Sequence, residues 1–169
     1  MPNAFWIVLL IGAMWLGDCQ AQRRSTARSE LKDSLYLKIS RTGCYGRCPI
    51  DAVELLPGGK VRYHGIRFVA RMGIYERKLS PDEQKEVLSL FQQADFGKYQ
   101  ELYDELGATD LPAVVVEYRH KGFSKRIVCR TGCPDELPKN IEQLRGLLAE
   151  KGNFQKIAGS EEEKSPKDE

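Results

Sequence analysis

Four of the five cysteines are grouped in a pattern that could support chemistry, two C-x-x-x-C pairs each followed by proline. They are Cys44 with Cys48 and Cys129 with Cys133. Cysteines at this spacing can form disulfides, and two such pairs on separate loops can also supply the four thiolates of a zinc site. The pattern therefore predicts either two disulfides or a metal or thiol-redox site on the same residues.

The cellular compartment of the protein decides between disulfides and a metal or redox site, because four thiols in an exported protein are normally oxidised to disulfides. Four cysteines allow three connectivities. We favour Cys44–Cys48 and Cys129–Cys133, since each pair is close in sequence and can close without the rest of the fold. Bonds between the two loops remain the main rival, because they would restrict the unfolded chain more. Copper or zinc binding, or thiol-redox handling, on these four residues is the alternative.

The first 33 residues predict export. Residues 5–17 are an uncharged apolar run, too short for a membrane-spanning helix but right for the apolar part of a secretory signal. We predict a signal peptide over residues 1–18 and acylation of Cys19, which would tether the protein to the lipid bilayer. Cleavage after Ala21 would instead release a soluble protein. Residues 19–33 are basic and predict a tether.

The folded part is predicted over residues 34–156. Apolar residues alternate from 35 to 39 and again through 50–64, where Pro57-Gly58-Gly59 marks a hairpin turn. A further strand is expected within 66–79, interrupted near Gly73, and a second hairpin over 113–129. The cysteine pairs fall in loops at strand ends.

Two helices complete this pattern. Ser80, Pro81 and Glu83 form a capping-box start, followed by an apolar stripe that ends at Gly97. A closing helix is predicted over 134–151, with Pro138 tolerated in its first turn. The order predicts a two-layer α+β domain, with a mainly antiparallel sheet and both helices packed on one face.

The charge balance and the lack of known motifs exclude several classes of function but do not assign one. Lys and Arg total 26 against 24 Asp and Glu, a net charge of +2, so the charge does not indicate a nucleic-acid partner. Residues 157–169 are predicted to be an acidic, disordered tail, because the last ten residues are rich in acids and contain no large apolar residue. The sequence contains no recognisable catalytic or phosphate-binding motif, and we expect no catalytic residue and no cofactor. The following groups are expected on the surface: His64 and His120, and a solvated carboxylate loop of Asp104, Glu105 and Asp110 around Tyr99 and Tyr103.

The string from Thr42 to Pro49, TGCYGRCP, resembles a family of bacterial domains of unknown function found mainly in secreted proteins and lipoproteins. Its other shared features are a strand–turn–strand with Gly in the turn, a middle helix, a Thr-Asp segment matched by Thr109-Asp110, and a last strand and helix. The resemblance covers about residues 34–150 and implies the fold and an envelope location, but no activity. Cys129 and Cys133 add to the usual family pattern, which favours each pair being self-contained. The Cys44 loop also resembles the copper site of Sco-type proteins, but there the motif opens a helix and here a strand follows Pro49.

These observations together predict an uncharacterised exported or lipid-anchored envelope protein. It is expected to be a non-enzymatic binding or structural module with two disulfides, and its partner is an unidentified protein or small molecule. The loop between Cys44 and Cys48 carries Tyr45 and Arg47, which we expect to contact that partner.

Overall fold

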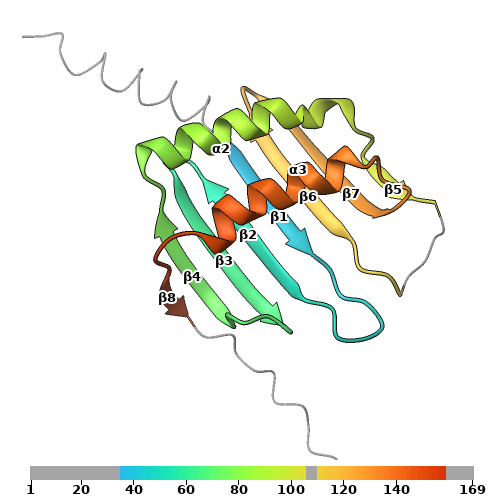
Figure 1. Cartoon of the computed structure of the whole chain (residues 1–169), viewed down its shortest axis with the longest axis horizontal. Coiled ribbons are helices and arrows are strands. Elements are labelled where there is room, and N and C mark those ends of the chain that lie inside the picture. The colour runs from blue at the N-terminus through green and yellow to red at the C-terminus, as the bar shows by residue number, and fades with distance from the viewer. Residues whose placement is uncertain (1–34, 106–109, 159–169) are drawn as a thin grey trace, which may run out of the picture.

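The strands form one sheet whose two faces differ in chemistry. In the computed structural model, which describes residues 35–105 and 110–158, both helices pack on the same face of this sheet (Figure 1). Leu37, Ile39 and Val53 are fully buried beneath the helices. Lys38 and Glu54, which alternate with them along β1 and β2, point to the other face. The predicted two-layer α+β architecture is therefore confirmed.

The sheet has eight strands in the order β5-β7-β6-β1-β2-β3-β4-β8. In chain order the elements are β1 (Tyr36–Arg41), β2 (Ile50–Leu56), β3 (Lys60–Arg67), β4 (Gly73–Lys78), α2 (Pro81–Ala94), the 3-10 helix η1 (Phe96–Lys98), β5 (Leu102–Asp104), β6 (Val114–His120), β7 (Phe123–Thr131), α3 (Glu136–Arg145), the π-helical turn η2 (Gly146–Glu150) and β8 (Gln155–Ala158). All neighbouring strands are antiparallel except β5 and β7, which are parallel. Both predicted hairpins are present, and the strand expected within 66–79 begins at Gly73.

Two short edge strands were not predicted. β5 has three residues and β8 four, too few for a period of two to stand out in the sequence. β5 lies in the stretch that we expected to be a solvated loop. β8 pairs with β4 and continues to Ala158, two residues past the predicted end of the domain at 156.

Helix α2 begins with the predicted capping box. The Ser80 hydroxyl accepts a hydrogen bond from the Glu83 backbone N–H at 3.3 Å, and the Glu83 carboxylate accepts one from the Ser80 backbone N–H at 2.7 Å. The hydrogen bond from the Ser80 backbone N–H, together with one from the Arg77 guanidinium, lowers the pKa of Glu83 to about 2. The helix ends at Ala94, earlier than expected, because Asp95 adopts a left-handed conformation and a 3-10 turn follows.

Helix α3 presents Leu137, Ile141 and Leu144 to the core, as its spacing predicted, with Pro138 in the first turn. The helix then changes to the π-helical turn η2, in which Leu148 is buried. One residue on this buried side is charged. Arg145 is 5% exposed, and its side chain reaches the underlying strand β2.

Several predictions concern residues outside 35–105 and 110–158. These are the signal peptide over 1–18, the acylation of Cys19, the basic tether over 19–33, the match of Thr109 to the Thr-Asp segment of the family, and residues 159–169 of the acidic tail. Within the described ranges, no helix has the length and apolar character needed to cross a membrane.

Candidate functional site

The four clustered cysteines are paired within their own loops. The Cα atoms of Cys44 and Cys48 lie 5.7 Å apart and those of Cys129 and Cys133 lie 5.9 Å apart, and each pair is joined through its sulfur atoms. The favoured local connectivity is therefore the observed one. Loops this short stabilise a fold by only about 2 kcal/mol each through chain entropy, so their main effect is to fix local geometry.

Cys44–Cys48 follows the end of β1, and Cys129–Cys133 spans the end of β7. The strands β1, β3 and β7 run in the same direction, so they end on the same side of the sheet (Figure 1). The segment 42–49 is joined there to the segment 110–113. The Thr42 N–H donates to the Ala113 carbonyl at 2.9 Å, and the Ala113 N–H donates to the Thr42 hydroxyl at 2.8 Å. The Tyr45 N–H donates to the Asp110 carbonyl at 3.0 Å. These bonds and the disulfide hold the loop at both ends. We call the segments 42–49, 66–72 and 110–113 the disulfide edge.

Tyr45 is the most exposed large side chain described on this edge, at 95% of its full accessible area. Arg47 projects from the same loop, and its guanidinium lies 5.5 Å from the ring centroid of Phe68. The Arg67 guanidinium lies 4.9 Å from the same ring. Phe68 has φ 54°, a left-handed conformation that is unusual for a bulky residue. Ile66 and Met72 are also exposed on the segment that carries Phe68.

The repeated Arg-Thr-Gly-Cys tetrapeptide uses its arginine in the same way at both places. Arg41 donates two hydrogen bonds to Asp51, at 2.8 and 2.6 Å, and Arg130 pairs with Asp104 at 2.9 Å. Each cysteine loop is therefore tied to a neighbouring strand by an ion pair. The sequence repeat was visible, but its acidic partners were not identifiable without the strand pairing.

The prediction of a solvated carboxylate loop around Tyr99 and Tyr103 was wrong in part. Asp104 is in strand β5 and paired with Arg130, Tyr99 is buried in the core, and Tyr103 packs against it. Asp110 contributes its backbone carbonyl to the Tyr45 loop. Lys125 donates to the carbonyls of Gly97 and Tyr99, which closes this region further.

A buried ionic cluster beneath the disulfide edge was missed by the sequence analysis. Asp51 is 1% exposed, and besides Arg41 its carboxylate accepts from the Tyr63 hydroxyl at 3.1 Å and from Arg145 Nη2 at 3.1 Å. The available signal was its position: Asp51 falls on the same face of β2 as Val53 and Leu55, where an apolar residue is expected.

The cluster shifts the pKa values of Asp51 and Tyr63. Burial raises the pKa of Asp51, but the hydrogen bonds from Arg41 and the charges of Arg145 and Arg41 outweigh it, so this pKa lies below 3.8. Burial and the neighbouring Asp51 charge raise the pKa of Tyr63 to about 12. At neutral pH the cluster therefore contains one carboxylate, two guanidinium groups and a neutral phenol.

The segment 66–72 folds back against β3 because residue 65 is glycine. A Cβ atom at Gly65 would lie 1.7 Å from the Arg71 carbonyl oxygen, well inside van der Waals contact. Arg71 is fixed over the ring of Tyr63 at 4.9 Å and donates to the Ala149 carbonyl. The close approach therefore places Arg71 beside the buried cluster.

The histidines are more enclosed than expected. His64 lies within β3, and His120 at the end of β6 makes an edge contact with Phe91, with ring centroids 5.7 Å apart. Both are half-buried, so the expectation of exposed surface histidines was wrong. In residues 35–105 and 110–158, no three His, Cys, Asp or Glu side chains are grouped as a metal ion would require.

The face opposite the helices carries charges of alternating sign across six strands. From β4 to β7 the residues in register are Glu76, Arg62, Glu54, Lys38, Glu117 and Arg126. Three pairs are in contact: Arg62–Glu76 at 2.8 Å, Lys38–Glu54 at 3.2 Å and Arg126–Glu117 at 3.1 Å. Opposite charges across strands each contribute about 0.2–1 kcal/mol and favour this register.

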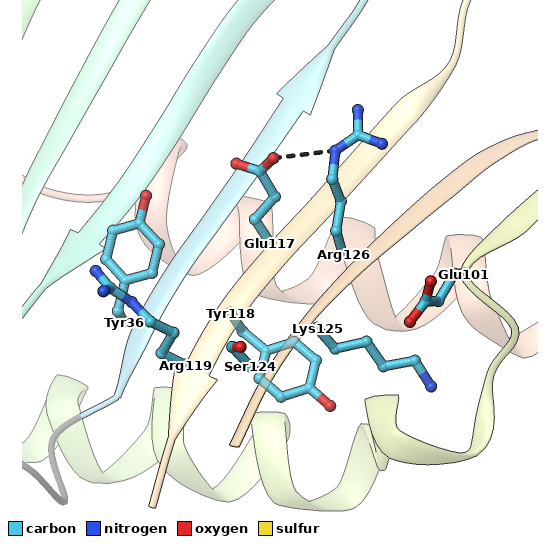
Figure 2. Close-up of a pocket in the computed structure, with 8 residues that line it drawn as sticks. All are labelled: Tyr36, Glu101, Glu117, Tyr118, Arg119, Ser124, Lys125 and Arg126. Atoms are coloured by element: carbon cyan, nitrogen blue, oxygen red, sulfur yellow. Dashed lines mark hydrogen bonds and ion pairs between the residues drawn. The ribbon is translucent and has the colours of Figure 1, made fainter. Parts of the chain in front are cut away.

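A depression of about 460 Å³ lies at the β6–β7 end of this face (Figure 2). Figure 2 shows Glu117 and Arg126 joined to each other, and Arg119 beside the ring of Tyr36. The Arg119 guanidinium is 4.9 Å from that ring centroid. Glu117 and Arg126 thus pair with each other, Arg119 is engaged with Tyr36, and we interpret the depression as a solvated surface.

The profile of one protein family, described as "Domain of unknown function (DUF6438)", matches residues 35–148. This range spans the sheet from β1 to β7, both helices, the disulfide edge and the buried cluster. No curated protein matches the chain at a significant level.

Proposed function

Since the chain belongs to the DUF6438 family, whose description names no activity, we propose from its geometry that it is an exported, non-enzymatic binding module. In this proposal the disulfide edge contacts a protein partner, and Tyr45 is the central contact residue. The observation that carries it is a nearly fully exposed tyrosine on a loop whose two ends are fixed.

An exposed aromatic side chain on a rigid loop is well suited to binding. Tyrosine buries a large area on association, and a loop already closed by Cys44–Cys48 loses little conformational entropy when it binds. The bonds from Thr42 and Tyr45 to the 110–113 segment add to this preorganisation.

The surroundings of Tyr45 indicate the chemistry of the partner. Arg47 and Arg67 flank Phe68, and the segment 66–72 adds exposed apolar side chains. Tyrosine and arginine are enriched among the residues that dominate binding energy at protein interfaces. The partner surface that complements this edge is apolar with acidic groups at its rim.

Export accounts for the oxidised cysteines, because disulfides persist in oxidising compartments and are rare in the cytosol. Acylation of Cys19 would place the domain on an envelope membrane, with residues 20–33 as the spacer. A single acyl group gives only weak anchoring, and the bases of that spacer would add attraction to anionic lipid headgroups.

We expect the double variant Tyr45→Ala and Arg47→Ala to lose partner binding without loss of the fold. Truncating residues at the centre of an interface costs about 2 kcal/mol or more each, a fall in affinity of at least tenfold. The measurement is photo-crosslinking from a benzoylphenylalanine at position 45 in the native host, with excess wild-type or double-variant protein as competitor.

The matched control places the same crosslinker at Lys85, an exposed position on α2 and far from the disulfide edge. The proposal expects one discrete adduct from position 45, none from position 85, and competition by the wild type alone. Equal competition by the double variant, or the same adduct from both positions, would overturn the assignment of this edge.

A further inference from the structure

A cavity of about 310 Å³ opens beside the buried cluster, between the C-terminal end of α3 with η2, the strands β2 and β3, and the segment 66–72. Small-molecule sites in proteins begin at about 300 Å³. Its inner wall carries Arg41, Asp51 and Arg145. Pro49, Phe68 and Val69 supply apolar wall on the side of the disulfide edge.

One polar atom of Arg145, a residue that lines this wall, lacks a partner. Arg145 donates from Nη2 to Asp51, but its Nη1 is shielded from solvent and has no hydrogen-bond partner among the described residues. A buried donor without an acceptor is costly, more so when it is charged. Asp51 cannot relieve it readily, because its carboxylate already accepts four hydrogen bonds from Arg41, Tyr63 and Arg145.

The distribution of charge favours a ligand with a single negative charge. Arg41, Arg71 and Arg145 line the cavity with Asp51 as the one buried acid, an excess of two positive charges among its buried and half-buried groups. Glu142 and Glu150 also line it but are exposed. A monoanion whose charge lies at the inner end is attracted by the arginines, whereas a dianion meets more repulsion from the exposed acids.

We propose that this cavity binds a small monocarboxylate with a short apolar tail. One carboxylate oxygen accepts a hydrogen bond from Arg145 Nη1, and the tail lies against Pro49, Phe68 and Val69. Binding includes a small rotation of the side chains around Nη1, because that atom is shielded from solvent as the structure stands. This site is separate from the protein-contacting role of Tyr45.

The test is isothermal titration of the oxidised protein, purified from its native host, with butyrate, with the neutral isostere butyramide and with phosphate. Butyrate is expected to bind one site with a dissociation constant on the order of 1 mM. Butyramide is expected to bind at least about tenfold more weakly, because it lacks the charge that Arg145 recognises. Phosphate is expected to bind more weakly than butyrate.

Three variants locate the site. Arg145→Gln is expected to weaken butyrate binding about tenfold or more, and Ala70→Phe to abolish it by filling the cavity from an exposed wall position. Arg126→Gln, on the ion-paired face, is the control and keeps full binding. If Arg145→Gln does not fold, judged by circular dichroism, Ala70→Phe alone decides.

The proposal is overturned by any of four results. These are no saturable binding of butyrate up to about 20 mM, some twenty times the expected constant; equal binding of butyramide; tighter binding of phosphate; or unchanged binding in a folded Arg145→Gln or Ala70→Phe variant.

Discussion

Replacing Asp51 by asparagine is expected to lower the free energy of unfolding by about 3–5 kcal/mol, because it leaves buried Arg145 without a compensating charge. The substitution keeps the shape of the side chain, removes its charge and replaces one accepting oxygen by an amide group that donates. Asp51 is 1% exposed and accepts hydrogen bonds from three side chains, so solvent cannot replace the lost charge. Chemical denaturation of the oxidised protein, followed by circular dichroism, measures the change.

The matched control is Glu54→Gln, on the same strand but on the opposite face. Glu54 forms a partly exposed pair with Lys38, which contributes at most about 1 kcal/mol. Adding Arg145→Met to Asp51→Asn is expected to restore part of the lost stability, because it removes the uncompensated charge. An Asp51→Asn variant no less stable than Glu54→Gln would contradict the importance of this cluster.

The pH dependence has a defined sign. Because the pKa of Asp51 is below 3.8 in the folded protein, its contribution to stability is present above that value and is lost as the pH falls through the folded pKa. Asp51→Asn removes this part of the acid destabilisation. The remaining carboxylates, including Glu83, still contribute to the profile.

Gly65→Ala is expected to cost about 3 kcal/mol, at the upper end for overpacking a buried position. The added Cβ would meet the Arg71 carbonyl oxygen at 1.7 Å, and that atom belongs to the backbone, so the segment 66–72 must move. The same displacement shifts Arg71 and Phe68, and the variant is therefore also expected to lose butyrate binding. Denaturation and titration measure the two effects.

Gly146→Ala is the control for this substitution. A Cβ atom at Gly146 meets nothing within 4 Å, and its φ is helical, so alanine is expected to stabilise the protein by about 0.5–1 kcal/mol. If the two alanine variants had similar stabilities, the close approach at Gly65 would not be a feature of the protein in solution.

The helices and main hairpins were predictable because their signals are local. The capping box at Ser80 is contained in four residues, and the apolar spacing from Leu137 to Leu148 lies within one segment. The strand alternation around Leu37 and Val53 also gave the buried face correctly. β5 and β8 escaped prediction because short edge strands are defined by their neighbours, β7 and β4.

The candidate site was predictable only where the sequence repeats itself. The two cysteine loops could be paired from their spacing, and Tyr45 could be singled out from its place between two bonded cysteines, whereas its exposure is seen only in the structure. The buried cluster could not be assembled, because Arg145 lies 94 residues from Asp51 and its helical position looks like an ordinary polar one. The need for glycine at position 65 could not be recognised in the sequence, because it comes from the close approach of the Arg71 backbone carbonyl and not from any side chain.

The central claim is that this is an exported protein whose two cysteine loops are each closed by a local disulfide, and intact mass of the protein from its native host tests it most directly. We predict a chain that has lost its first 18 residues, or those up to Ala21, with a mass about four daltons below that of the fully reduced form, two for each bond. Acylation would add a lipid mass at Cys19. A full-length chain with its leader in place and all five cysteines as free thiols would contradict the claim.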